Sequence, residues 1–179
     1  MKRVIVDVDG VLADFVGGIL DAVEASTGHR PLWRGESGCD VKDALDKRDA
    51  EFALEALFSP GFCSNLRPLS GALAGVRELA KAADVRIVTA LPVSESWASE
   101  RMEWLRHRGF SKDQIVFTGS KYLVEADAIV DDRRHVIEQW IAHRPKTLAF
   151  MWESLSLTAP APAGSIRCSD WSAVRDLLS

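Results

Sequence analysis

The stretch that decides the fold opens the chain, MKRVIVDVDGVLADF over residues 1–15. Val4-Ile5-Val6 is an uninterrupted apolar run, which indicates a strand buried on both faces of a sheet. Two acids, Asp7 and Asp9, come directly after it and are followed by Gly10. Because Asp and Gly are ordinary turn residues, the pair alone is also compatible with a plain loop. The interpretation therefore depends on what ends the other strands.

Composition and charge narrow the class of protein. The chain has 179 residues, of which 47% are hydrophobic and 27% charged, as in a globular domain with a sizeable core. Its net charge of -4 argues against a nucleic-acid polymer as partner, because such a partner requires a basic face. No apolar run approaches the ~20 residues of a membrane span, and no signal peptide is visible. Three separated cysteines without a CxxC pair favour a reducing compartment, so we expect a cytoplasmic protein.

Apolar runs alternate with amphipathic segments along most of the chain. Further strands are predicted at 85–88, 115–117, 128–130 and 147–150. Helices are predicted at 71–83, 94–108, 133–143 and 171–178. This alternation predicts an α/β fold, a Rossmann-like three-layer parallel sheet with helices on both faces. In such sheets ligands bind beyond the carboxyl ends of the strands, where Asp7 and Asp9 would lie.

Residues 15–68 break the alternation. A helix is predicted over 14–27, ending at Gly28, and a second helical region over 41–58, with no strand between them. We expect a small helical cap, residues 15–68, inserted after the first strand. The α/β core would then comprise residues 1–14 and 69–179.

Polar side chains end the other predicted strands. Thr89 ends the second strand, Lys121 lies just beyond the third, and Asp131 and Asp132 end the fourth. Chance is a poor explanation for such endings on four strands, so we interpret them as one functional site. Carboxylates gathered at one edge repel each other and require a cation. With oxygen ligands only, the set indicates a hard ion such as Mg2+.

This set of side chains is suited to phosphoryl chemistry. A lysine, a threonine hydroxyl and Mg2+ would neutralise and orient a phosphate, so that a carboxylate can attack phosphorus. The second acid of the D-x-D pair is near enough to protonate the departing alkoxide and later to activate water. No serine lies in a G-x-S-x-G turn, and the cysteines have no evident basic partner. A carboxylate is therefore the expected nucleophile.

With these motifs in place, the chain resembles the haloacid dehalogenase superfamily of phosphohydrolases. The resemblance rests on DVDGVLADF, the strand ending in Thr89, Lys121 and IVDDR. It is closest to the 5'(3')-deoxyribonucleotidase branch, the cytosolic type C nucleotidases. The shared segments are DVDGVLADF with its two following glycines, PGFCSNLRPLSGA over 60–72, and Ser169-Asp170-Trp171.

The resemblance implies a role for each motif residue. Asp7 would be the nucleophile that forms an aspartyl phosphate, and Asp9 the general acid and base. Thr89, the backbone of Ala90 and Lys121 would hold the phosphate. Mg2+ would be held by Asp7, Asp131 and Asp132 and by the backbone carbonyl of Asp9. Asp14 and Phe15 would contact the substrate. Which of Asp131 and Asp132 touches the ion directly is left open.

Two departures from the family pattern concern the substrate. Ala90 replaces the usual serine after the threonine, and Gly38-Cys39-Asp40 stands where an aromatic pair is expected. Aromatic residues elsewhere in the cap either replace this pair or belong to its core: Trp33, Phe52, Phe58 and Phe62. We expect Trp97 and Trp104 to be core residues and the histidines at 107, 135 and 143 to be surface residues. Arg133 either starts a helix or pairs with the preceding acids.

The expected substrate is therefore a small phosphomonoester. A nucleoside 5'-monophosphate is favoured, and the preference for deoxypyrimidine types rests on the resemblance only. The alternatives are a phosphatase for another small ester, such as a sugar phosphate, and a nucleotide-binding module without turnover. The resemblance also suggests a homodimer.

Overall fold

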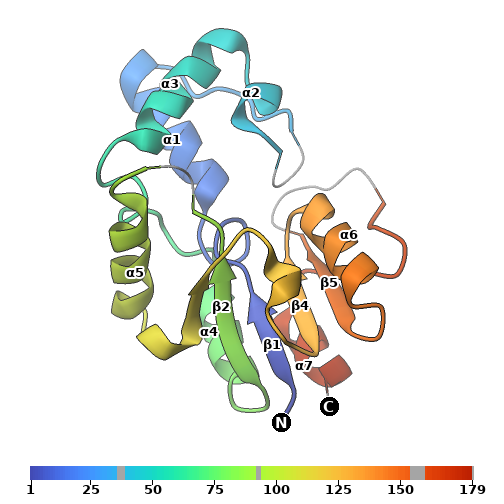
Figure 1. The fold of residues 1–179 in the computed structure, drawn as a ribbon. Coiled ribbons are helices and arrows are strands. Elements are labelled where there is room, and N and C mark those ends of the chain that lie inside the picture. Colours follow the sequence, from blue (N-terminus) through green and yellow to red (C-terminus); the bar gives the residue numbers. More distant parts are fainter. Residues whose placement is uncertain (36–38, 92–93, 154–159, 179) are drawn as a thin grey trace.

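The computed structural model describes residues 1–35, 39–91, 94–153 and 160–178. Its centre is a six-stranded parallel sheet with the order β3-β2-β1-β4-β5-β6 (Figure 1). Strand β1 is therefore internal to the sheet. Strands β2 and β3 extend the sheet on one side of it, and β4, β5 and β6 extend it on the other. The strands are β1 (Arg3–Val6), β2 (Asp84–Thr89), β3 (Ile115–Phe117), β4 (Ala128–Asp131), β5 (Leu148–Trp152) and β6 (Ile166–Cys168).

Helices cover both faces of the sheet, which gives the predicted three-layer α/β fold (Figure 1). One face packs against α4 and α7, and the other against α6. The α-helices are α1 (Phe15–Thr27), α2 (Val41–Ala44), α3 (Lys47–Phe58), α4 (Ala72–Leu79), α5 (Trp97–His107), α6 (Arg134–His143) and α7 (Trp171–Leu178). Short 3-10 helices are η1 (Lys112–Gln114) and η2 (Lys121–Leu123).

The apolar run in β1 follows from this central position. Val4 and Val6 contribute to the core beneath α4 and α7, whereas Ile5 faces the opposite side and joins the cluster that contains Ile137 and Trp140 of α6. All three β1 side chains are buried. A strand covered on both faces has no solvent-facing position, which is why its sequence does not alternate.

A tight turn after β1 sets the direction of the acids. The carbonyl of Val8 accepts hydrogen bonds from the backbone N–H groups of Leu12 and Ala13, both at 2.8 Å. Gly10 has φ +74°, a conformation that favours glycine. A Cβ atom there would lie 1.9 Å from Oδ2 of Asp132. Glycine is therefore required by both the backbone angle and the close approach of that carboxylate.

Helices α1, α2 and α3 lie beyond the carboxyl ends of β1 and β2 (Figure 1). We call residues 15–68 the helical insert. The chain enters and leaves it at adjacent points, because Ala13 and Pro68 form an antiparallel bridge. The N–H of Asp14 also donates to the carbonyl of Arg67, and the N–H of Leu69 to that of Leu12, both at 2.8 Å. The insert is thus joined to the sheet by two paired segments of backbone.

The structure differs from the sequence prediction in two elements. The helical region predicted over 41–58 is two helices, because Leu45 is extended and the Asp46 carboxylate caps a new helix by accepting the N–H of Asp49 at 3.0 Å. Strand β6 was not predicted, since a three-residue edge strand with an exposed Arg167 carries almost no pattern. Part of the loop predicted over 158–164 lies outside the described residues.

Candidate active site

Three buried carboxylates meet at the carboxyl edge of the sheet. Asp7 follows β1, Asp131 ends the neighbouring β4 and Asp132 follows it, and one oxygen from each lies within 4.8 Å of the others. Lys121, from η2 beyond β3, reaches the same point. Its Nζ lies 2.7 Å from Oδ1 of Asp7 and 2.6 Å from Oδ2 of Asp131. A single ammonium group therefore balances two of the three carboxylates.

Burial and charge oppose each other within this cluster. Burial raises the pKa of Asp131 to about 6, although the Lys121 ammonium acts to lower it. The same burial disfavours the charge on Lys121, but Asp131 and Asp7 outweigh it and raise the lysine pKa. Lys121 is therefore a protonated cation at neutral pH. The Arg133 N–H also donates to Oδ1 of Asp131 at 2.9 Å.

Asp9 is turned toward a different cation. Nη2 of Arg101 lies 2.6 Å from Oδ1 of Asp9. Arg101 comes from α5, is fully buried, and lies over the rings of Trp97 and Trp104, 5.3 and 5.8 Å from their centroids. Burial raises the pKa of Asp9, the Arg101 guanidinium lowers it, and the charge of Asp7 raises it again. The net pKa of Asp9 is raised.

The residues expected to hold a phosphate line one small hollow of about 120 Å³ beside Asp7 and Asp9. The Thr89 hydroxyl is buried and donates to the carbonyl of Ala90 at 3.2 Å. Other residues of this hollow are Gly119, Lys121, Arg133, His135 and Val136. The hollow therefore combines a hydroxyl with cationic side chains, as an anion requires.

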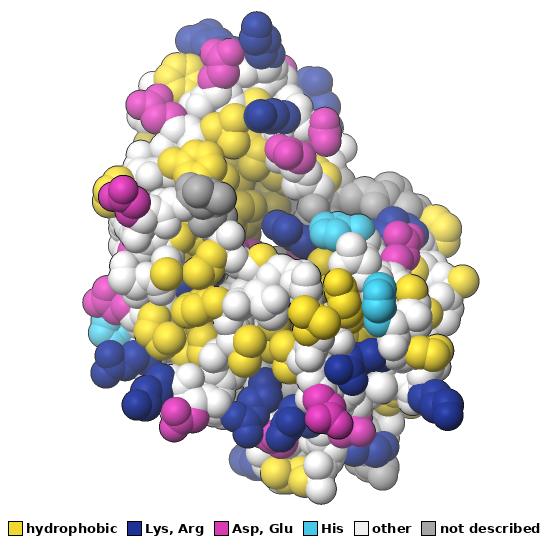
Figure 2. Space-filling model, in the orientation of Figure 1, with side chains coloured by type: hydrophobic (Ala, Val, Ile, Leu, Met, Phe, Trp, Pro, Cys, Tyr) yellow, Lys and Arg dark blue, Asp and Glu magenta, His cyan; other side chains and the backbone are white. Residues whose placement is uncertain are grey.

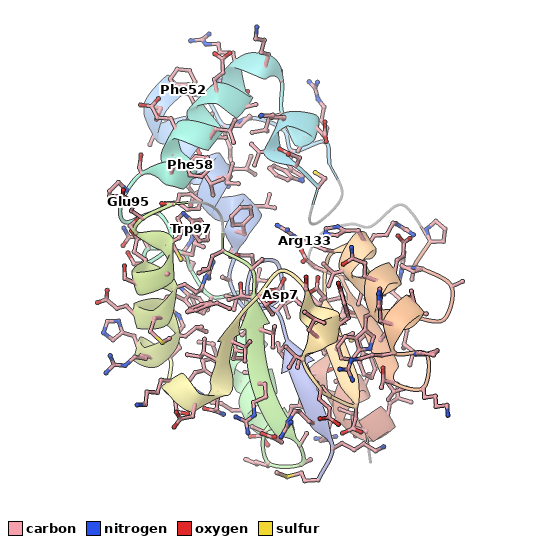
Figure 3. The ribbon with its side chains drawn as sticks, in the orientation of Figure 1. Asp7, Phe52, Phe58, Glu95, Trp97 and Arg133 are labelled. Atoms are coloured by element: carbon pink, nitrogen blue, oxygen red, sulfur yellow. The ribbon has the colours of Figure 1, made fainter. Side chains whose placement is uncertain are left out.

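A second, narrow cleft separates the sheet edge from the helical insert. Phe15, Trp33 and Cys39 of the insert line it opposite Asp132 and Arg133. Figure 2 shows the molecule hollowed between the two parts, with hydrophobic surface on the wall of the hollow and basic side chains at its lower edge. In Figure 3, Arg133 lies above the end of β4 near this opening, and Asp7 lies below it. A ligand bound at Asp7 would thus extend toward Phe15 and Trp33.

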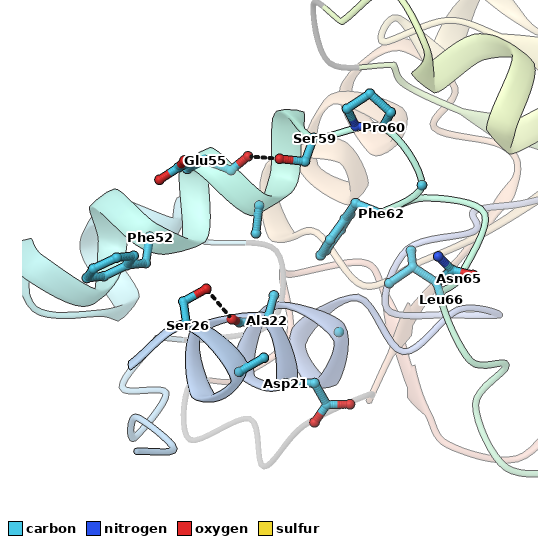
Figure 4. Close-up of a pocket in the computed structure, with 14 residues that line it drawn as sticks. Asp21, Ala22, Ser26, Phe52, Glu55, Ser59, Pro60, Phe62, Asn65 and Leu66 are labelled. Carbon is cyan, nitrogen blue, oxygen red and sulfur yellow. Dashed lines mark hydrogen bonds between the residues drawn. The ribbon is translucent and has the colours of Figure 1, made fainter. Parts of the chain in front are cut away.

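The four aromatic candidates of the insert lie in different places. Trp33 lines the narrow cleft, whereas Phe52 and Phe62 line a separate groove of about 640 Å³ between α1 and α3 (Figure 4). Phe58 is 47% exposed. This larger groove shares no lining residue with the carboxylate site. Of the four, Trp33 is the one placed to contact a ligand at the site.

Other predicted positions are placed as follows. The Asp14 carboxylate caps α1 by accepting the N–H of Gly17 at 2.9 Å, whereas its neighbour Phe15 faces the cleft. Asp40 caps α2, and Gly38 lies outside the described residues. Arg133 immediately precedes α6, and the bond it donates to Asp131 comes from its backbone N–H, so the helix-start interpretation applies.

Sequence reasoning missed two residues near the site. Arg101 lies in the helix predicted over 94–108 but was not among the predicted site residues, yet it pairs with Asp9. The available signal was a charged residue four after one core tryptophan and three before the next, on a face that is otherwise apolar. His135 was expected at the surface; it is exposed, but it also lines the phosphate hollow.

Solved structures share this fold. A haloacid dehalogenase-like family hydrolase from Streptococcus pneumoniae aligns with a TM-score of 0.63 at 14% identity, over 100% of this chain and 99% of the other. A hydrolase from Pseudomonas syringae aligns with a TM-score of 0.58 at 18% identity, over 99% and 98%. The chain therefore has the fold found in hydrolases of the haloacid dehalogenase class.

Sequence comparison identifies the family within that class. The model of the family described as "5' nucleotidase, deoxy (Pyrimidine), cytosolic type C protein" matches residues 1–178. The human 5'(3')-deoxyribonucleotidase, mitochondrial, is 34% identical over 146 residues, covering 73% of this chain and 62% of the relative. The human cytosolic type is 32% identical over 141 residues, covering 73% and 70%.

The chain therefore belongs to this 5'-nucleotidase family and is a phosphoric monoester hydrolase. The resemblance inferred from the motifs is confirmed. In the described part of the chain, no helix has both the length and the apolar character needed to cross a membrane.

Proposed function

We propose that this chain is a Mg2+-dependent nucleotidase that hydrolyses nucleoside 5'-monophosphates through an aspartyl phosphate on Asp7. The observation that supports it most is the buried cluster of Asp7, Asp131 and Asp132, with Lys121 bonded to Asp7 and Asp131. This arrangement places a carboxylate oxygen at the floor of a hollow suited to a phosphate. We infer the substrate class from the relatives of the chain, which are 5'(3')-deoxyribonucleotidases.

The first step transfers the phosphoryl group to the enzyme. An oxygen of Asp7 attacks phosphorus, the bond from phosphorus to the sugar oxygen breaks, and Asp9 donates its proton to that oxygen. The raised pKa of Asp9 favours the protonated form that this step needs. Thr89, Lys121 and the N–H of Ala90 hold the equatorial oxygens and stabilise their charge.

The second step returns the enzyme to its starting state. Asp9, now a carboxylate, takes a proton from water as the water oxygen bonds to phosphorus. The bond between phosphorus and Asp7 breaks, and inorganic phosphate leaves. The ion pair with Arg101 stabilises the charged form of Asp9 between the two steps.

The donor set fits Mg2+, because the cluster offers buried carboxylate oxygens and no sulfur or imidazole ligand within the described residues. Asp7, Asp131, Asp132 and the backbone carbonyl of Asp9 would hold the ion. Bound there, Mg2+ would offset negative charge between the attacking carboxylate and the phosphate.

We propose that the helical insert, residues 15–68, is a substrate cap, and that residues 1–14 and 69–179 form the catalytic core. Phe15 and Trp33 line the cleft that leads to the carboxylates, so they are the candidates to contact the nucleoside. Flat apolar side chains suit the stacking of a base. A preference for deoxypyrimidine nucleotides is part of this proposal and follows from the family.

The proposed setting is the cytoplasm, and the proposed assembly is a homodimer, as the resemblance suggests. Sedimentation velocity of the purified chain measures the assembly directly. A species of one chain at micromolar concentration would contradict the dimer without affecting the proposed chemistry.

Phosphate release from a panel of nucleoside monophosphates, sugar phosphates and an aryl phosphate tests the proposed function. We expect Mg2+-dependent release that EDTA abolishes and that Asp7→Asn reduces to background, with nucleoside 5'-monophosphates as the best substrates. Asp43→Asn is the matched control, because Asp43 is an exposed acid of the insert. Activity that survives Asp7→Asn contradicts the nucleophile. Sugar phosphates as the best substrates contradict the substrate class, and nucleotide binding without turnover favours a binding module.

A further inference from the structure

Helix α5 contacts both parts of the molecule. It follows β2 and lies beside the sheet, below the end of α3, where Trp97 at its first turn marks the junction with the insert (Figures 1 and 3). Its inward-facing residues bond to two targets. One target is the backbone that returns from the insert to the sheet, Leu57 to Leu66, which we call the return segment, and the other is Asp9.

Glu100 provides the densest set of contacts to the return segment. Its Oε1 accepts the N–H of Gly61 at 2.8 Å, and its Oε2 accepts those of Cys63 and Ser64 at 3.1 and 3.2 Å. A carboxylate that accepts several backbone N–H groups makes strong, charge-assisted bonds. The carboxylate also gives these backbone N–H groups a hydrogen-bond acceptor in place of water.

Two tryptophans and an arginine add donors at both ends of this segment. Nε1 of Trp97 donates to the carbonyl of Leu57 at 2.8 Å, and Nε1 of Trp104 to that of Leu66 at 2.6 Å. Nη2 of Arg108 reaches the same Leu66 carbonyl at 3.3 Å. Both indoles are buried, so these bonds are shielded from water. Helix α5 therefore fixes the return segment along its whole length.

The residue after Glu100 bonds to the proposed acid. Arg101 is fully buried between the two tryptophan rings, which leaves its guanidinium little freedom to move. It holds Oδ1 of Asp9 at 2.6 Å. Adjacent positions of one rigid helix thus hold the return segment and the Asp9 carboxylate. A shift of α5 relative to the sheet would displace both together.

We propose that α5 couples the position of the helical insert to that of the Asp9 carboxylate. Glu100 and Arg101 are positioning residues: Glu100 fixes the return segment, and Arg101 fixes the carboxylate, in one arrangement. The inference rests on the proposed function, since it concerns the proton transfer assigned to Asp9. Its consequence is that a change at Glu100, which lies outside the catalytic hollow, reduces proton transfer at Asp9.

The leaving group of the substrate makes this effect measurable. A nucleoside monophosphate expels an alkoxide and needs a proton from Asp9, whereas p-nitrophenyl phosphate expels a stable phenolate. Glu100→Gln keeps the size of the side chain but turns an NH2 group toward backbone donors. We expect kcat/KM of this variant to fall about ten-fold or more for the nucleotide and about three-fold or less for the aryl phosphate. This constant reports the transfer to Asp7 and not the later hydrolysis, in which Asp9 acts on both substrates alike.

A double-mutant cycle tests the coupling itself. Arg101→Lys retains the charge and shortens the reach, so it should lower the nucleotide-to-aryl ratio of kcat/KM in the wild-type background. If α5 couples the two sites, Arg101→Lys lowers this ratio by less in the Glu100→Gln background, because the arrangement is already disturbed. Glu103→Gln, at an exposed position of the same helix, is the matched control and should leave the ratio unchanged.

The outcomes separate the inference from the proposed function. If the wild type hydrolyses neither substrate, the proposed function fails and the inference with it. If the wild type hydrolyses both, equal losses on the two substrates, or additive effects in the cycle, overturn only the coupling. Should Glu100→Gln fail to fold, Glu100→Asp replaces it, since this change keeps the carboxylate but shortens its reach to the N–H groups of Gly61, Cys63 and Ser64.

Discussion

Lys121 is the residue on which the balance of charge at the sheet edge depends. It is 4% exposed and bonds Asp7 and Asp131, beside the third carboxylate of Asp132. Carboxylates this close and this deeply buried are costly unless a cation lies among them. Lys121 therefore stabilises the fold as well as contributing to the proposed phosphate site.

We expect Lys121→Met to lower the free energy of unfolding by about 3–5 kcal/mol at pH 8 in EDTA, because it leaves buried charge uncompensated. The loss should be smaller at pH 5. The pKa of Asp131 is about 6 with the lysine present and rises without it, so the folded variant binds more protons than the unfolded chain. Its stability consequently falls as the pH rises through this range.

Urea denaturation at the two pH values measures this difference. Lys112→Met, which removes an exposed lysine from η1, is the control and should change stability little at either pH. An equal loss for Lys121→Met at pH 5 and pH 8 would contradict the proposed role of the carboxylates.

At this scale the sequence predicted which side chains would meet, but not how they pair. The strand endings Asp7, Thr89 and Asp131 share one edge because parallel strands present their carboxyl ends together. The pairing of Asp9 with Arg101 joins residues 92 positions apart and depends on where α5 packs. No local pattern contains that information.

Helix packing depends on close approach at one glycine of α4. The ring of Trp171 in α7 lies so near Gly75 that a Cβ atom there would be 2.1 Å from its Cδ1. Trp171 also lies against Trp152 of β5, with ring centroids 4.4 Å apart. Helices α4 and α7 therefore share one face of the sheet only because this position carries no side chain.

We expect Gly75→Ala to destabilise the protein by about 1–3 kcal/mol, because overpacking outweighs the better helix propensity of alanine. The control is the same change in a Trp171→Ala background. There the ring is gone but the Cβ atom of residue 171 stays 2.7 Å from the new Cβ, so the cost of Gly75→Ala should become smaller without disappearing. Thermal unfolding of the four proteins in this cycle measures these differences. A stabilising Gly75→Ala in the wild-type background would contradict the overpacking against Trp171.

Some helix boundaries could be predicted from the sequence, whereas others could not. Helix α7 begins and ends where it was predicted, since the Asp170 carboxylate precedes it and accepts the N–H of Ser172 in its first turn. The break between α2 and α3 was missed, because Leu45 continues the apolar spacing although it is extended and Asp46 caps a new helix. Capping residues inside an amphipathic pattern remain ambiguous until the backbone is seen.

Aromatic contacts join the helical insert to the part of the molecule that contains the sheet. Phe15 of α1, Phe62 of the return segment and Trp97 of α5 form a triangle with ring centroids 6.1 to 6.4 Å apart. Such contacts contribute about 0.5–1.5 kcal/mol per pair beyond area burial. Together with the bonds of Glu100, they connect the insert to the sheet on the side of α5.

We therefore expect insert and sheet to unfold in one cooperative transition. Urea curves followed by far-ultraviolet circular dichroism and by tryptophan fluorescence should coincide. Trp97→Ala should separate them, because it removes the shared ring and the bond to Leu57. Two resolved transitions in the wild type would show that the parts fold independently.

The fold class could be predicted from the sequence because strand and helix patterns alternate clearly outside residues 15–68. The sheet order places β1 between β2 and β4, as the fold class requires. The shape of the cleft could not be predicted, since it depends on which aromatic residue of the insert turns inward. Trp33 does so, and its sequence neighbourhood does not distinguish it from Phe52 or Phe62.

The bonds between α5 and the return segment reach only main-chain atoms: carbonyls of Leu57 and Leu66, and amides of Gly61, Cys63 and Ser64. These hydrogen bonds do not depend on side-chain identity, whereas the ring contacts of Phe15 and Phe62 with Trp97 do. Most other positions of residues 15–68 can therefore change in sequence while the attachment persists, and the bridge from Ala13 to Pro68 keeps the two ends of the insert adjacent. Swapping this segment between relatives would therefore exchange recognition surfaces while leaving the hydrolytic centre in place.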